Sequence, residues 1–211
     1  MIKSVGVFAF SLALLLTSET ASAMQFSWPV ILGRVATPTN HSMFFASNEL
    51  PTSVNKQYYD FGSDPNHIVR LYLTDTVRAL GNVNDLNNTV SLDAGYYPDI
   101  YEIATDGELR FYVVIGRGQQ YAEGINVDVI GKKNGKFVKF AGRAFFQGLH
   151  DENKYGPMGD VCRLSVQGNQ LILDCEKSIW DRNGLVERKK WQYVLTWKNR
   201  EQEFQVEYRP L

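Results

Sequence analysis

The sequence predicts an all-β protein, mainly an antiparallel meander that forms either a barrel or a sandwich. Three observations support this. Segments of alternating apolar and polar residues recur through the C-terminal half, turn signals separate them, and aromatic residues, which strands favour, make up 13% of the chain. Short helices are expected in the N-terminal third, where proline and asparagine interrupt the pattern.

The chain begins with a pattern typical of a secretory signal peptide. Lys3 precedes a predominantly apolar run at 5–16, and a polar run then ends in the small residues Ala21, Ser22 and Ala23. The apolar run is shorter than the roughly 20 residues that a membrane-spanning helix needs. We therefore predict that residues 1–23 are a signal peptide. Residues 24–211 are then a single β-rich domain, periplasmic or secreted, with no stable membrane anchor.

The N-terminal third contains one clear strand and two less regular segments. A strand is expected at 67–75, HIVRLYLTD, because β-branched and aromatic residues dominate it. The segments at 53–61 and 75–86 are each expected to hold a short helix, although neither keeps a helical period for long. We expect the early strands to complete a sheet that the later strands begin.

The middle of the chain predicts a strand at 109–117, followed by a hairpin around Asn134-Gly135, a strong turn signal. The alternation in this hairpin predicts one buried face and one face exposed to water. The buried face collects Ile125, Val127, Val129, Val138 and Phe140. The exposed face collects Asn126, Asp128, Lys132, Lys139 and Arg143.

The only two cysteines, Cys162 and Cys175, flank a second hairpin centred on Gly168-Asn169. This centre places the cysteines opposite each other and sets Arg163 against Asp174, a favourable cross-strand pair. Leu164, Val166, Leu171 and Leu173 share the cysteine face. Because exported proteins meet an oxidising environment, we predict a structural disulfide and no redox role.

The last strands also alternate. A turn is expected at Asn183-Gly184. The segment WQYVLTW then places four large side chains on one face (Trp191, Tyr193, Leu195 and Trp197), and EFQVEYRP turns Phe204, Val206 and Tyr208 inward.

The sequence contains none of the common catalytic motifs, and we predict no catalytic residue, cofactor or metal ligand set. The three histidines, His41, His67 and His150, are widely separated and are interpreted as exposed or capping residues. Asp151, Glu152 and Asp160 are assigned to an exposed loop. The segment 82–93 is rich in oxygen ligands for calcium, but turns use the same residues, and the turn interpretation is preferred. These residues are Asn84, Asp85, Asn87, Asn88 and Asp93.

Charge and aromatic placement favour binding to a macromolecule other than nucleic acid. The 22 basic and 23 acidic residues give a net charge of −1, which offers no attraction to nucleic acid. Aromatic side chains gather beside turn-forming residues, and tyrosine and tryptophan there provide rigid contact area, although capping of the core is the simpler explanation. The candidate binding residues are Tyr58, Tyr59, Tyr96, Tyr97, Tyr101 and Trp180.

The leading functional prediction is an exported, non-catalytic binding or interaction module that recognises a protein or another macromolecule. An inhibitor-type or immunity-type protein would have these features. The alternative is a β-barrel that encloses a small apolar or sugar ligand. A hydrolase and an outer-membrane β-barrel are further alternatives, which the absence of catalytic motifs and the turn-rich connections make less favoured.

Overall fold

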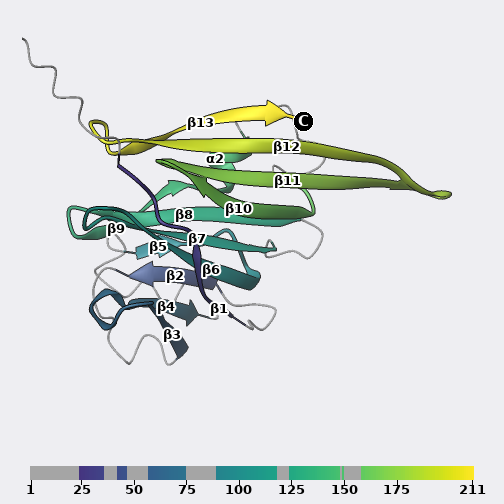
Figure 1. Cartoon of the computed structure of the whole chain (residues 1–211). Coiled ribbons are helices and arrows are strands. Elements are labelled where there is room, and N and C mark those ends of the chain that lie inside the picture. Colours follow the sequence, from purple (N-terminus) through teal and green to yellow (C-terminus); the bar gives the residue numbers. More distant parts are fainter. Residues whose placement is uncertain are drawn as a thin grey trace, which may run out of the picture.

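The computed structural model describes residues 24–35, 42–46, 57–74, 89–117, 124–147, 149 and 158–211. Three antiparallel sheets lie in successive layers (Figure 1). The all-β prediction is confirmed, and none of the three sheets of the described residues closes into a barrel. The layered arrangement therefore corresponds to the sandwich alternative, with a third sheet added. The predicted signal peptide lies outside the described residues.

The middle layer is a five-stranded sheet with the order β1-β6-β7-β8-β9. Its strands are β1 (Val30–Arg34), β6 (Tyr96–Ala104), β7 (Arg110–Arg117), β8 (Ile125–Lys133) and β9 (Lys136–Ala141). The predicted strand at 109–117 and the predicted hairpin around Asn134-Gly135 are both confirmed. The two turn residues have φ values of 54° and 76°, as a type I′ turn requires. A short helix, α2 (Arg143–Gln147), follows β9.

One outer layer is a four-stranded meander in the order β10-β11-β12-β13. Its strands are β10 (Val161–Gln167), β11 (Gln170–Asp181), β12 (Gly184–Lys198) and β13 (Glu203–Pro210). The predicted register of the cysteine hairpin is confirmed at every position, from Gln167 opposite Gln170 to Cys162 opposite Cys175. The two cysteines form a disulfide across Cα atoms 4.2 Å apart.

The other outer layer is a four-stranded sheet in the order β3-β4-β2-β5. Its strands are β2 (Ser42–Ala46), β3 (Gln57–Phe61), β4 (Val69–Thr74) and β5 (Thr89–Ser91), and a 3-10 turn (Pro65–His67) precedes β4. The predicted strand at 67–75 corresponds to β4. The helix expected at 53–61 is wrong over Gln57–Phe61, which pairs with β4 as an edge strand. The helix expected at 75–86 lies outside the described residues.

Two cores separate the three layers. The first lies between the middle sheet and β10–β13 and contains the four alternating side chains of β12, the predicted inward face of β13, and the disulfide. Phe111, Phe140, Trp197 and Phe204 form its aromatic centre, with ring centroids 4.9 to 6.0 Å apart. The second core lies between the middle sheet and β2–β5 and includes Phe45, Leu71 and Ile130.

The second core corrects the prediction that one face of the β8–β9 hairpin meets water. Both faces of β8 are covered, so Ile130 is fully buried and Asn126 and Asp128 retain only 1% and 0% of their exposure. The alternation in this hairpin distinguishes two buried faces, of which one carries polar groups. Such groups require internal partners, because an isolated buried charge is very unfavourable.

Candidate binding surfaces

The candidate aromatic residues occupy separate parts of the molecule. Tyr58 and Tyr59 are 49% and 40% exposed on β3, the edge strand of its sheet. They therefore lie on a strand and not in the short helix expected at 53–61. The Arg70 guanidinium lies 4.2 Å from the ring centroid of Tyr58, which holds that ring against its neighbouring strand.

Tyr96, Tyr97 and Tyr101 belong to β6, in the middle layer. Tyr97 is 58% exposed, with a positive φ of 44°, at an irregularity in the pairing of β6 with β7. Tyr101 packs against the first core, and its burial raises the pKa of its hydroxyl above the usual value. The core-capping alternative thus applies to Tyr101.

Trp180 lies beside the turn of the β11–β12 hairpin, which extends past the ends of β10 and β13 (Figure 1). β3 belongs to the opposite outer layer of the molecule. The structure therefore does not bring the six candidate residues into one recognition patch, and Trp180 stands alone among them at the end of a projecting arm.

The projecting arm results from a mismatch in strand length. Pairing of β10 with β11 ends at Glu176, and pairing of β13 with β12 ends at Trp191. Within the described part of the chain, residues 177–189 consequently pair only with each other. A two-stranded ribbon without a packed face is marginally stable in water, so this arm gains little from its own contacts.

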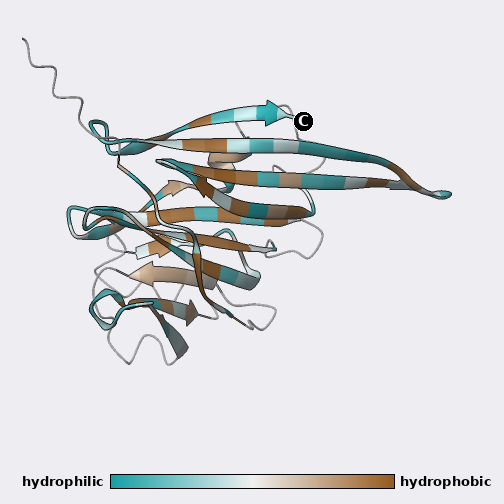
Figure 2. Ribbon diagram, viewed as in Figure 1, coloured by the Kyte–Doolittle hydropathy of each residue, from teal (hydrophilic) through white to brown (hydrophobic). Residues whose placement is uncertain are grey.

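Apolar side chains gather near the end of this arm. Trp180 pairs with Leu185 across the ribbon, so the two side chains share a face. Trp180, Leu185 and Val186 are 66%, 41% and 61% exposed, and Figure 2 shows hydrophobic residues close to the tip of the hairpin. The turn itself consists of polar residues, and within it the Asp181 side chain accepts a hydrogen bond of 2.7 Å from the backbone N–H of Asn183.

The base of the arm is braced and carries charge. Asp160, which the sequence assigned to an exposed loop, accepts a hydrogen bond from Ser178 N (2.9 Å) and lies 3.0 Å from Lys177 Nζ. On the face that Trp180 shares, Arg188 and Lys190 lie 3.9 and 3.7 Å from a single carboxylate, Glu176. Two exposed cations thus share one anion on the face that carries the exposed indole.

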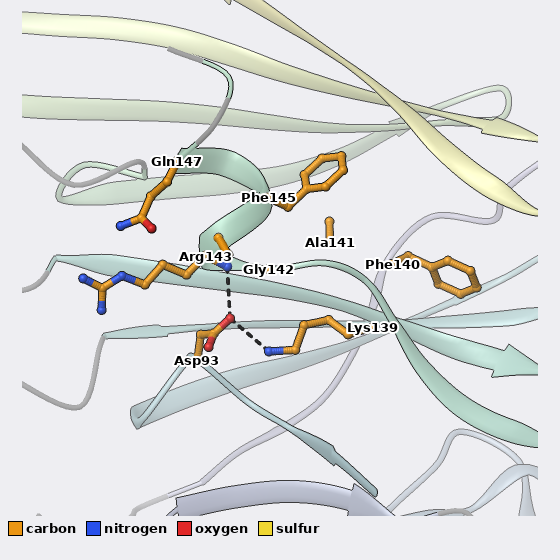
Figure 3. Close-up of a pocket in the computed structure, with 9 residues that line it drawn as sticks. Asp93, Lys139, Phe140, Ala141, Gly142, Arg143, Phe145 and Gln147 are labelled. Carbon is orange, nitrogen blue, oxygen red and sulfur yellow. Dashed lines mark hydrogen bonds and ion pairs between the residues drawn. The ribbon is translucent and has the colours of Figure 1, made fainter. Parts of the chain in front are cut away.

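A second candidate site surrounds Asp128, on the polar face of β8. The Asp128 carboxylate is fully buried and lies 2.7 Å from Lys139 Nζ. Its other oxygen accepts hydrogen bonds from the backbone N–H groups of Asp93 (2.7 Å) and Ala94 (3.0 Å). Lys139 Nζ also lies 2.9 Å from Asp93 Oδ2, which accepts a hydrogen bond from Arg143 N (Figure 3).

The two carboxylates titrate differently because their surroundings differ. Burial raises the pKa of Asp128 to about 6, although Lys139 opposes the rise. Burial also acts to raise the pKa of Asp93, but its hydrogen bonds from Lys139 and from Arg143 N hold that pKa below its usual value. Burial lowers the pKa of Lys139, yet Asp128 and Asp93 together raise it above its usual value.

This network forms one side of a pocket with a volume of about 420 Å³ between β9 and α2. Asp93 and Lys139 provide its charged side, Phe140 and Phe145 belong to its apolar part, and Gln147 lies at its edge (Figure 3). A mainly apolar pocket with a few convergent polar groups is a general signature of a binding site. The sequence did not identify it, because the alternation placed Asp128 and Lys139 on a solvent face.

The remaining residues that the sequence singled out carry no visible site. His67 Nδ1 lies 2.9 Å from Asp64, the cap of the 3-10 turn, which agrees with a capping histidine. Among the described residues no group of three His, Cys, Asp or Glu side chains is arranged to hold a metal ion. Outside them lie His41, His150, Asp151 and Glu152, and so does the calcium candidate segment except for residues 89–93.

Comparisons with protein-family models, with curated proteins and with solved structures returned no match, so function is argued from the site alone. In the part of the chain that the structure describes, no helix has the length and apolar character needed to cross a membrane.

Proposed function

We propose that this chain is an exported, non-catalytic interaction module that binds a protein partner through the β11–β12 hairpin. The observation that carries the proposal is the exposure of Trp180, at 66%, at the end of a ribbon that no other described strand pairs. The disulfide between Cys162 and Cys175 is compatible with export, since such bonds persist in oxidising compartments.

The composition of the arm supports this role. Tryptophan and arginine are residues in which interface energy concentrates, because tryptophan gives a large rigid contact area and arginine gives a planar cation with five hydrogen-bond donors. Here Trp180 and Leu185 provide apolar area, while Arg188 extends from the same face. Covering these groups with a partner would remove exposed apolar surface, at roughly 25 cal/mol per Å², and would give the ribbon the packed face that it lacks.

A projecting arm also suits an inhibitor-type or immunity-type protein, because a ribbon two strands wide can enter a cleft that a flat sheet cannot. This form of the proposal requires the arm to be braced at its base so that the tip is presented in one orientation. The contacts of Asp160 with Ser178 N and Lys177 Nζ provide such a brace.

The proposal is tested by affinity capture with three oxidised proteins spanning residues 24–211: wild type, Trp180→Ala and Trp28→Ala. Trp28 is a matched control, because it is a tryptophan with 75% exposure outside the arm. Each protein is immobilised and exposed to cell-envelope and culture extracts, and bound proteins are identified by mass spectrometry. We expect wild type and Trp28→Ala to retain the same stoichiometric partner and Trp180→Ala to lose it. Equal retention by all three would contradict the proposal.

A second candidate function, the binding of a small molecule, is favoured by the pocket beside Asp93 and Lys139. Its volume of about 420 Å³ falls within the range of ligand pockets, about 300–1,000 Å³. The layered sheets leave no barrel lumen for the ligand, so the pocket replaces the barrel interior as the expected location. Native mass spectrometry of the protein purified from its host would show a co-purifying compound. The compound should be absent from the variant Ala144→Trp, whose indole fills the pocket. It should remain in the variant Lys136→Met, because Lys136 belongs to β9 but does not line the pocket.

A further inference from the structure

The face of the hairpin that carries Trp180 also carries a hollow at its base. This pocket has a volume of about 260 Å³ and is lined by residues of β10, β11 and β12 together with Leu211. Val161 and Leu211, which are 45% and 71% exposed, contribute its apolar side chains. Arg163 and Lys190 contribute its cations, and Asp174 and Glu176 contribute its carboxylates.

The pocket suits an aromatic side chain. Its volume lies below the roughly 300–1,000 Å³ of pockets that take drug-sized molecules, and it corresponds better to a single large side chain. Arg163 and Lys190 line it beside apolar groups, and cations in that position attract the face of an aromatic ring. Among aromatic residues tryptophan gives the strongest attraction of this kind.

The arm of the same chain cannot fill this pocket. Along β11 side chains alternate between the two faces, so Trp180 and Glu176, four residues apart, point to the same side. Glu176 lines the pocket. Four residues of a strand span roughly 13 Å, and the pairing of β11 with β12, which continues through one register shift between Ile179 and Trp180, holds the indole at that distance. Trp180 and the pocket therefore lie on one face, and neither is filled or covered by its counterpart among the described residues.

We propose that the partner of the hairpin is a second copy of this chain, with Trp180 of each copy seated in the pocket formed by Val161, Lys190 and Leu211 of the other. This inference rests on the proposed function, because it names the partner of the same arm. A two-fold rotation brings Trp180 of the first copy to the pocket of the second and Trp180 of the second copy to the pocket of the first. Both contacts therefore form at once, and the assembly closes as a dimer.

The charges between the two contacts fit the same arrangement. Glu176 is shared by Arg188 and Lys190 at 3.9 and 3.7 Å, distances at the long end for ion pairs. In a two-fold pair each Glu176 meets the cations of the other copy as well as its own. A face that carries carboxylate and cations side by side is therefore complementary to itself, as an isologous contact requires.

Two measurements test the dimer. Light scattering coupled to gel filtration, over a concentration series, gives the mass of wild type, Trp180→Ala and Trp28→Ala. We expect wild type and Trp28→Ala to reach the mass of two chains, and Trp180→Ala to remain at the mass of one over the same series. The circular dichroism spectrum of Trp180→Ala should match that of wild type, because the indole is outside both cores. Melting curves should match at concentrations where wild type is monomeric, and the wild-type melting temperature alone should rise with concentration.

Cysteine cross-linking locates the contact. Trp180→Cys and Leu211→Cys are purified separately, mixed and oxidised mildly, and heterodimers are identified by their mass. A disulfide requires Cα atoms within about 7 Å, which the proposed seating provides between copies and the arm does not provide within one copy. We expect heterodimers in large excess over a control mixture of Trp28→Cys with Leu211→Cys.

A monomeric mass at every concentration, with cross-linking equal to the control, would overturn the inference. Open-ended oligomers would overturn it as well, because they would mean that the contact does not close by two-fold rotation. If the monomer captures a different protein through Trp180, the inference falls while the proposed function stands. If the masses and the captured proteins are both unchanged in Trp180→Ala, the inference and the proposed function fall together.

Discussion

Replacing Lys139 with methionine should destabilise the fold in a way that depends on pH. Lys139 Nζ lies 2.7 Å from Asp128, whose carboxylate is fully buried. Methionine keeps most of the aliphatic stem and removes the charge. The variant must then either bury an unpaired carboxylate or protonate it, because an isolated buried charge is strongly unfavourable.

The magnitude follows from linkage. Asp128 has a pKa of about 6 in the folded protein, against an ordinary value of 3.8. The folded state therefore binds the proton more tightly, and the contribution of Asp128 to stability falls as pH rises from about 4 to about 6. Between low pH and pH 7.5, the raised pKa lowers the free energy of unfolding of wild type by roughly 3 kcal/mol. A carboxyl that stayed protonated in the folded state at pH 7.5 would lower it by roughly 5 kcal/mol. Loss of Lys139 should thus cost up to about 2 kcal/mol more at pH 7.5 than at pH 5, where Asp128 is mostly protonated in both proteins.

Urea unfolding at pH 7.5 and pH 5 measures this difference, with Lys136→Met as the control, since Lys136 is an exposed lysine of the same strand. The double variant Lys139→Met with Asp128→Asn should lose the pH dependence. Destabilisation by Lys139→Met of equal size at the two pH values would refute the reasoning, because it would show that Asp128 does not hold the relevant proton.

Two further predictions concern stability. Replacing both Cys162 and Cys175 with alanine should lower the free energy of unfolding by roughly 3 kcal/mol, the chain-entropy value for a loop of this length. An unchanged midpoint of urea unfolding would mean that strand pairing stabilises the hairpin without help from the disulfide. At concentrations where wild type is monomeric, Trp180→Ala should change stability by less than about 0.5 kcal/mol, whereas Trp197→Ala, at a 2% exposed core position, should cost about 3–5 kcal/mol. Comparable melting temperatures for the two tryptophan variants would contradict the assignment of Trp180 to a contact surface.

Local pairing was predictable because the residues that determine it are close in the sequence. The turn at Gly168-Asn169, the alternation on either side and the two cysteines all indicate one register, and that register is found. The same holds for the inward face of β12, from Trp191 to Trp197. In both cases a shift of one residue would move the whole apolar set to the wrong face.

The buried polar network was not predictable by the same means. Alternation shows that the Asp128 side chain points to the face of β8 opposite to that of Val127 and Val129. It does not show which element covers the Asp128 face. The cover is the sheet formed by β2–β5, whose strands are short and separated by long connections in the sequence. Its position over β8 depends on contacts between distant segments, which carry no periodic signal.

The projecting arm lies between these two cases. The turn beside Trp180 was predicted, and the pairing partners of β11 and β12 follow from the order of the meander. The arm arises because β10 and β13 have 7 and 8 residues while β11 and β12 have 12 and 15. Once those lengths are known, the ribbon must extend beyond its neighbours, and Trp180 must lie away from both cores.

The measurement that most directly tests the hairpin as the contact surface is photo-cross-linking in the native host. A photoreactive phenylalanine analogue replaces Trp180 in one protein and Trp28 in another, and cross-linked products are identified by mass spectrometry after irradiation of intact cells. The account predicts one dominant protein product at position 180, either a second copy of the chain or another protein, and none at position 28. The same products at both positions, or none at position 180, would contradict it.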